Sequence, residues 1–163
     1  MTTAKKCVVW LEDNPHEDSL LALSNYIEKK QDQGVYLRSA TGIMQLRRHL
    51  DEAKAEEEIV CGIILDIIVH GMTNLSSFER SDIRWGKGTA DAGNKLIKYV
   101  FRSHKDNPWG YLSDVPILVL SVKVDISESE FKEFGDNIRV VQKYEDDDWE
   151  LEVKAWVEKV VKS

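Results

Sequence analysis

The sequence predicts an α/β domain built on a parallel sheet, and three observations support this prediction. Short apolar runs recur along the chain, each bounded by polar residues, as in strands that are buried on both faces. Segments with the apolar spacing of amphipathic helices separate these runs, which is typical of parallel strands joined by helices. Polar residues stand where the runs end, and the carboxyl ends of parallel strands meet at one edge of a sheet.

The first half of the chain contains two strand–helix units and a third strand. The first strand is expected at residues 5–12, and Asn14 and Pro15 then resemble an N-cap followed by proline at the first helical position. Apolar residues at helical spacing continue this helix to about Lys30. The next elements are a strand at 35–39, a helix with Ile43, Leu46, Leu50 and Ala53 on one stripe, and a strand at 59–65.

The second half of the chain begins with a segment that has no clear period. Residues 73–90 include two glycines and predict a long inserted loop. A third helix is expected at 90–104 and a fourth strand in PILVLS, which ends at Ser121. Ser127 and Glu130 have the spacing of a capping box, so they predict a short fourth helix that stops at Gly135. A fifth strand at 138–142 and a final helix with Trp149, Val153, Trp156, Val157 and Val160 on one stripe complete the chain.

The polar residues at the strand ends are the candidate functional site. Glu12 and Asp13 follow the first strand, Asp66 the third, Ser121 ends the fourth and Lys143 follows the fifth. Three carboxylates at one edge of a sheet repel one another unless a cation neutralises them. Because all of their ligand atoms are oxygens, the cation that they suit best is Mg²⁺.

This set of residues resembles the receiver domain of two-component response regulators. The resemblance rests on an acidic pair after strand one, an aspartate after strand three, a hydroxyl residue after strand four and a lysine after strand five. The segment LDIIVHGM also resembles the phosphoacceptor stretch of the family. The family usually has proline where His70 stands, and often proline where Tyr144 stands. The spacing from Asp66 to Ser121 is longer than usual, which is why we expect an insertion at about 73–90 within a single domain of residues 1–163.

The resemblance implies a fold and a set of roles. The fold would be flavodoxin-like, a doubly wound (βα)5 parallel sheet with strand order 2-1-3-4-5. Asp66 would accept a phosphoryl group from a histidine kinase or a histidine phosphotransfer protein, and Lys143 and Ser121 would contact that group. Mg²⁺ would be held by Glu12, Asp13, Asp66 and the backbone carbonyl of Ile68. The chain would then be a signalling switch rather than an enzyme, with a downstream protein as its second partner.

Three residues depart from the family pattern, and two alternative functions stay open. Val122 replaces a small residue beside the aspartate, apolar Ile68 lies where an attacking water would approach, and Val140 replaces the usual switching aromatic. One alternative is a pseudo-receiver, which uses the same fold as a phosphorylation-independent interaction module. The other is a Mg²⁺-dependent phosphohydrolase, which Ile68 disfavours because such enzymes carry a second aspartate at that position.

The composition limits the location and the partners. The formal net charge of −7 argues against direct binding of nucleic acid, and no apolar run is long enough for a membrane span. The amino-terminal residues lead directly into the first strand and leave no room for a signal peptide. Cys7 and Cys61 lie in the first and third strands, where we expect buried free thiols. We therefore expect a cytoplasmic protein that makes no contact with a membrane.

Overall fold

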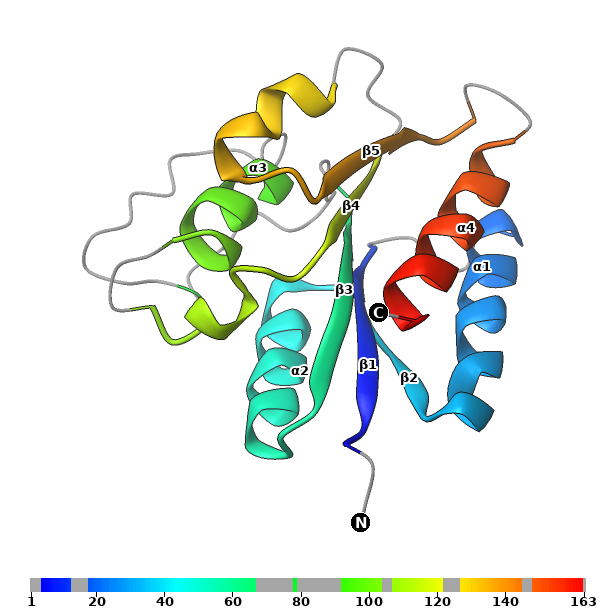
Figure 1. Ribbon diagram of the computed structural model, residues 1–163, viewed down its shortest axis with the longest axis horizontal. Coiled ribbons are helices and arrows are strands. Elements are labelled where there is room, and N and C mark those ends of the chain that lie inside the picture. The colour runs from blue at the N-terminus through cyan, green and yellow to red at the C-terminus, as the bar shows by residue number, and fades with distance from the viewer. Residues whose placement is uncertain are drawn as a thin grey trace.

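The computed structural model describes residues 4–12, 18–66, 78, 92–103, 107–121, 127–144 and 148–162. Five parallel strands form one sheet in the order β2-β1-β3-β4-β5, which confirms the predicted topology (Figure 1). The strands are β1 (Lys6–Leu11), β2 (Val35–Ala40), β3 (Ile59–Leu65), β4 (Ile117–Ser121) and β5 (Ile138–Gln142).

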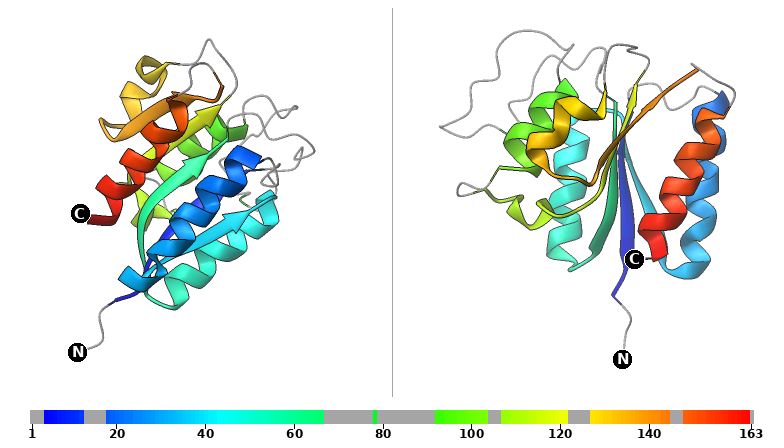
Figure 2. Two further views of the ribbon diagram at one scale, coloured as in Figure 1. Left: turned by 90° about the vertical axis from the view of Figure 1, so that its right-hand side faces the viewer. Right: turned by 45° about the horizontal axis from the view of Figure 1, so that its top comes forward.

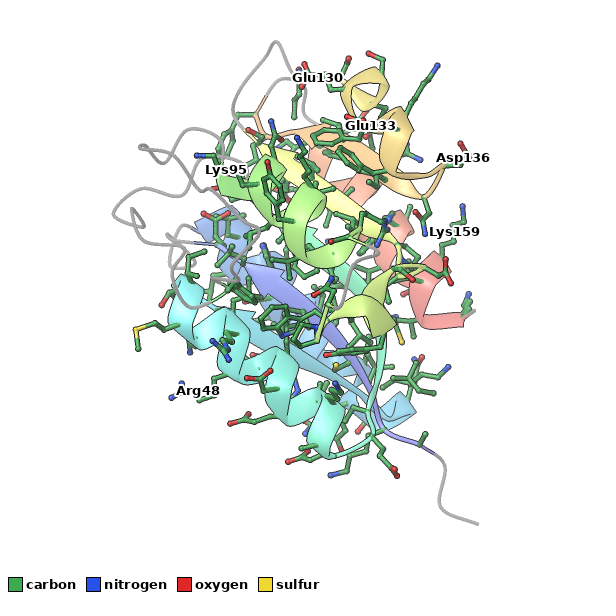
Figure 3. The ribbon with its side chains drawn as sticks, turned by 90° about the vertical axis from the view of Figure 1, so that its left-hand side faces the viewer. Arg48, Lys95, Glu130, Glu133, Asp136 and Lys159 are labelled. Carbon is green, nitrogen blue, oxygen red and sulfur yellow. The ribbon has the colours of Figure 1, made fainter. Side chains whose placement is uncertain are left out.

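Helices cover both faces of this sheet. The helical elements are α1 (Asp18–Glu28) with η1 (Lys29–Gln33), α2 (Ile43–Ala55), α3 (Ala92–Leu96) with η3 (Ile97–Phe101), η4 (Gly110–Leu112), η5 (Glu128–Phe134) and α4 (Trp149–Lys162). Figure 2 shows α1 and α4 together on one face and α2, α3 and η5 on the other. Each layer buries its own apolar core against the sheet, and Figure 3 shows charged residues such as Arg48 of α2 and Glu133 of η5 on the outside of the second layer. None of the described helices has the length and apolar character that a membrane span requires.

The apolar stripes predicted for α2 and α4 are confirmed. Ile43, Leu46, Leu50 and Ala53 are the buried residues of α2. All five predicted residues of the last stripe are buried in α4, together with Val161. Spacing by three and four residues places them on one side of each helix, so each helix packs on the sheet while its charged side faces outward.

A glycine in the central strand β3 explains how closely α4 can approach the sheet. A Cβ atom built on Gly62 would lie 2.6 Å from the ring of Trp156 in α4, closer than van der Waals contact allows. The absent side chain therefore gives the indole its place on the sheet. Cys7 and Cys61, in β1 and β3, are buried free thiols as predicted, and burial raises the pKa of the Cys7 thiol to about 12.

Two predicted helices differ from those observed. The segment from Ser127 to Gly135 is a 3-10 helix, and the Ser127 side chain does not cap it. The third helix starts as α3 but continues as the π-helix η3 and ends at Phe101. The side-chain amide of Asn107 donates to the carbonyls of Val100 and Ser103. It thus supplies hydrogen bonds to carbonyl groups at the end of this helix that the helical ladder leaves without a donor. Nothing in apolar spacing distinguishes these tighter or wider turns from an α-helix.

Phe78 is the one described residue of the predicted insertion at 73–90, and it belongs to the core. Its side chain is fully buried in the core between the sheet and the α2 layer. The ring packs edge-on against Trp109, with 4.9 Å between the centroids. Phe78 lies in the first third of the segment, so part of the predicted insertion is anchored in the core. The remaining residues of 73–90 lie outside the described ranges.

A buried arginine connects the segments around the amino ends of β4 and β5. Arg102 is 6% exposed and donates to the carbonyls of Leu112, Val115 and Phe134 and to Oδ1 of Asn137. These partners belong to the loop before β4, the end of η5 and the start of β5. Burial lowers the pKa of Arg102, but the ring of acceptors satisfies its donors. The guanidinium thus acts as a cross-link in a region with little regular structure.

Candidate functional site

The sheet positions the candidate site through its hydrogen-bond ladder. The backbone N–H of Glu12 donates to the carbonyl of Ala40 at the end of β2, and that of Asp66 donates to Leu11 at the end of β1. The N–H of Lys143 donates to the carbonyl of Ser121 over 2.8 Å. Each residue is therefore fixed to the neighbouring strand end, and the four lie along the carboxyl edge of the sheet, as the sequence predicts.

Lys143 joins the two described carboxylates of the site. Its Nζ donates to Oε2 of Glu12 over 2.8 Å and lies 3.5 Å from Oδ2 of Asp66. The exposed fractions are 3% for Glu12, 5% for Asp66 and 8% for Lys143. Charged groups this deeply buried are retained only when they are paired. The three side chains are thus one electrostatic unit.

The charges of this unit shift the pKa of the lysine. Burial alone would lower the pKa of Lys143, but the negative charges of Asp66 and Glu12 outweigh burial and raise it. Lys143 is therefore an ammonium at neutral pH. One ammonium and two carboxylates give the described part of the site a formal charge of −1, which favours a further cation there. The donor set, made only of carboxylate oxygens, fits Mg²⁺.

Of the remaining predicted site residues, the structure describes only Ser121. Ser121 is fully buried at the end of β4. Asp13 and Ile68, the other predicted ligands of Mg²⁺, lie outside the described residues, as do His70 and Val122. Among the described residues no three acidic, histidine or cysteine side chains come together as a metal-binding group. A site for Mg²⁺ thus depends on Asp13 joining Glu12 and Asp66, and it stays a prediction.

One feature at the edge of the site is not readable from the sequence. Tyr144, the residue after Lys143, has a φ of +64°, a left-handed backbone conformation that residues other than glycine rarely adopt. The positive φ turns the chain sharply where β5 ends. The residue types of this segment do not predict the turn.

Comparisons of the structure with solved structures identify the fold. The chain superposes on a two-component response regulator from Cytophaga hutchinsonii with a TM-score of 0.57, at 16% sequence identity, over 99% of this chain and 100% of that one. It superposes on the chemotaxis response regulator CheY4 of Vibrio cholerae with a TM-score of 0.50, at 17% identity, over 95% and 99% of the two chains. The fold is that of a receiver domain. The expectation of a flavodoxin-like arrangement is thus confirmed.

The same fold also occurs in a protein of a different kind. The lysine decarboxylase LdcF of Francisella novicida matches with a TM-score of 0.50 and 17% identity, over 99% of this chain but only 17% of that one. No protein-family model and no curated protein matches the chain by sequence. Identities this low carry the fold alone, so the function has to be argued from the residues of the site.

Proposed function

We propose that the chain is a receiver domain that accepts a phosphoryl group on Asp66 and signals through contact with another protein. The observation that carries this proposal is the buried unit of Lys143, Glu12 and Asp66 at the carboxyl edge of the sheet. A lysine held beside an aspartate there supplies positive charge where a transferred phosphoryl group would place its oxygens. Such transfer depends mainly on positioning and on neutralisation of charge.

In the proposed reaction, a carboxylate oxygen of Asp66 attacks the phosphorus atom of a phosphohistidine. The new O–P bond forms as the N–P bond breaks, and the departing imidazole nitrogen takes a proton. Lys143 moves its ammonium from Glu12 toward the phosphoryl oxygens, and the Ser121 hydroxyl donates a hydrogen bond to one of them. When bound, Mg²⁺ supplies the remaining positive charge, and Glu12, Asp13, Asp66 and the Ile68 carbonyl would hold it.

The partners follow from this chemistry. A histidine kinase or a histidine phosphotransfer protein would supply the phosphoryl group, and an effector protein would recognise the phosphorylated form. In this proposal the chain is a signalling protein and not an enzyme that turns over a small substrate. We place the protein in the cytoplasm, where such kinases act, and we treat residues 1–163 as one domain.

Burial of the aspartate favours one alternative function. Asp66 is only 5% exposed, so a phosphodonor reaches it only after neighbouring atoms move aside. A pseudo-receiver would use the same fold for constitutive protein binding and would leave Asp66 unmodified. In that case the buried unit would have only a structural role.

Intact mass after incubation with acetyl phosphate and Mg²⁺ separates these two functions. A receiver gains the mass of one phosphoryl group, loses this gain in Asp66→Asn, and keeps it in the matched control Asp32→Asn, which changes an exposed aspartate of η1. Beryllofluoride should bind the wild type and not Asp66→Asn. A wild-type protein that gains no mass and binds no beryllofluoride would establish the pseudo-receiver.

A further inference from the structure

The residue that follows the site lysine is held in a strained conformation. Tyr144 is one of two described residues other than glycine with a positive φ, and the residue is 48% exposed. A left-handed backbone costs free energy for a residue with a Cβ atom, and it persists only where surrounding contacts hold it.

The ring of Tyr144 rests against the first residue of α4. The centroids of Tyr144 and Trp149 are 5.2 Å apart and the rings are inclined by 67°, an edge-to-face contact. Trp149 itself is 5% exposed and belongs to the core that α4 and α1 form on the sheet. Tyr144 thus connects the end of β5 to the beginning of α4, the helix that descends along the right-hand face in Figure 1.

The other side of this connection is the site. The backbone of Lys143 is fixed to Ser121, and its side chain is fixed to Glu12 and faces Asp66. Lys143 and Tyr144 are adjacent, so a movement that reaches the Lys143 backbone would also move the backbone of Tyr144. A strained residue between two fixed contacts responds to such a change because its conformation is not the one that it prefers alone.

The chain lacks an aromatic residue at the usual switching position of the receiver family. Val140, a partly buried residue of β5, stands there and has no ring to rotate. Tyr144 is an aromatic residue four positions later, directly after the lysine. Its position allows it to transmit a change at the site to α4 by a different route.

We propose that Tyr144 and Trp149 form the link through which occupancy of the site changes α4. This inference rests on the proposed function. A phosphoryl group on Asp66 draws Lys143 away from Glu12, the turn at 143–144 changes, and the Tyr144 ring shifts on Trp149. The first turn of α4 then changes its stability, and the exposed Tyr144 ring presents a different surface to a protein partner. The contact of Lys143 with Glu12 and the contact of Tyr144 with Trp149 would thus change together, and this couples the site to α4.

Hydrogen exchange of the backbone amides at the start of α4 tests this link. We expect beryllofluoride with Mg²⁺ to change the exchange rates of residues 149–153 several-fold in the wild type. Tyr144→Gly removes the ring and accepts a positive φ without strain, so it should bind beryllofluoride at Asp66 but lose the response in α4. Tyr144→Phe keeps the ring and should keep the response. The control Tyr36→Leu changes a tyrosine of β2, at the opposite edge of the sheet, and should also keep it.

Intact mass with acetyl phosphate, measured on the same samples, separates the two levels of the proposal. A wild-type protein that takes up no phosphoryl group refutes the proposed function and this link with it. A protein that is modified at Asp66 but shows no change in α4, or an unchanged response in Tyr144→Gly, refutes the link alone. If Tyr144→Gly does not fold, Tyr144→Asn serves the same purpose, because asparagine tolerates the left-handed conformation.

Discussion

Replacement of Lys143 by methionine should destabilise the fold more than any change of an exposed charge. Methionine has a similar length and no charge, so the variant leaves Glu12 and Asp66 as buried carboxylates without their ammonium. Removal of one partner from a buried ion pair costs about 3–5 kcal/mol. Glu12→Gln should cost only about 1.5–3 kcal/mol, the range for a hydrogen bond to a charged group, because Lys143 keeps Asp66 at 3.5 Å.

The pH dependence of this difference has a defined sign. Asp66 and Glu12 raise the pKa of Lys143 above its ordinary value. The folded state therefore binds the proton more tightly than the unfolded chain does. The stabilisation is fully present below the unfolded pKa of about 10.4 and is lost as the pH rises through the higher folded pKa. The free energies of unfolding of wild type and Lys143→Met should thus differ most at neutral pH and converge at strongly alkaline pH.

Urea unfolding followed by circular dichroism measures both effects. Lys162→Met is the matched control, because this lysine side chain of α4 is 76% exposed and should contribute less than about 1 kcal/mol. Millimolar Mg²⁺ should restore part of the stability of Lys143→Met, since a bound cation replaces the missing charge. A Lys143→Met protein as stable as Lys162→Met would refute the view that the buried charges form one unit.

Three further changes test the packing and the charge network. Gly62→Ala should cost about 1–3 kcal/mol in thermal unfolding, because its Cβ meets Trp156 at 2.6 Å, and adding Trp156→Leu should make the glycine change less costly. Phe78→Ala should cost about 3–5 kcal/mol, as for any large core side chain, and a value near zero would show that the segment is not anchored. His49 is neutral in the fold because burial lowers its pKa; stability should therefore fall as the pH drops below about 6.5, and His49→Gln should flatten that part of the profile.

The strands and the two long stripes were predictable because burial leaves a direct mark on sequence. A strand covered on both faces is apolar at every position, as in β3, and a helix on a sheet is apolar at every third or fourth position, as in α2. The strand ends follow from these runs, so the meeting of Glu12, Asp66, Ser121 and Lys143 was also predictable.

The features that sequence did not predict depend on contacts between distant segments. Phe78 stands among polar residues, and only its position on Trp109 makes it part of the core. Arg102 is a charged residue in sequence, and its burial depends on hydrogen-bond acceptors that three other segments supply. Tyr144 has a left-handed backbone, and its ring packs against Trp149, which is five residues away and begins another element. None of these contacts has a periodicity or a motif.

The fold leaves the function open, because the same arrangement of strands also occurs within a lysine decarboxylase. The charges of the site bear on the choice between the proposed receiver and a protein in which the buried ion pair is only structural. The Lys143 ammonium already pairs with the carboxylates of Glu12 and Asp66. A phosphoryl group on Asp66 would replace the charge of that carboxylate with a larger negative charge, and it would therefore compete with Glu12 for the ammonium. Lys143 would then leave Glu12, and Glu12 would become available to a cation. A site that exchanged partners in this way would suit the proposed switch, whereas a purely structural ion pair would be insensitive to Mg²⁺ and to beryllofluoride alike.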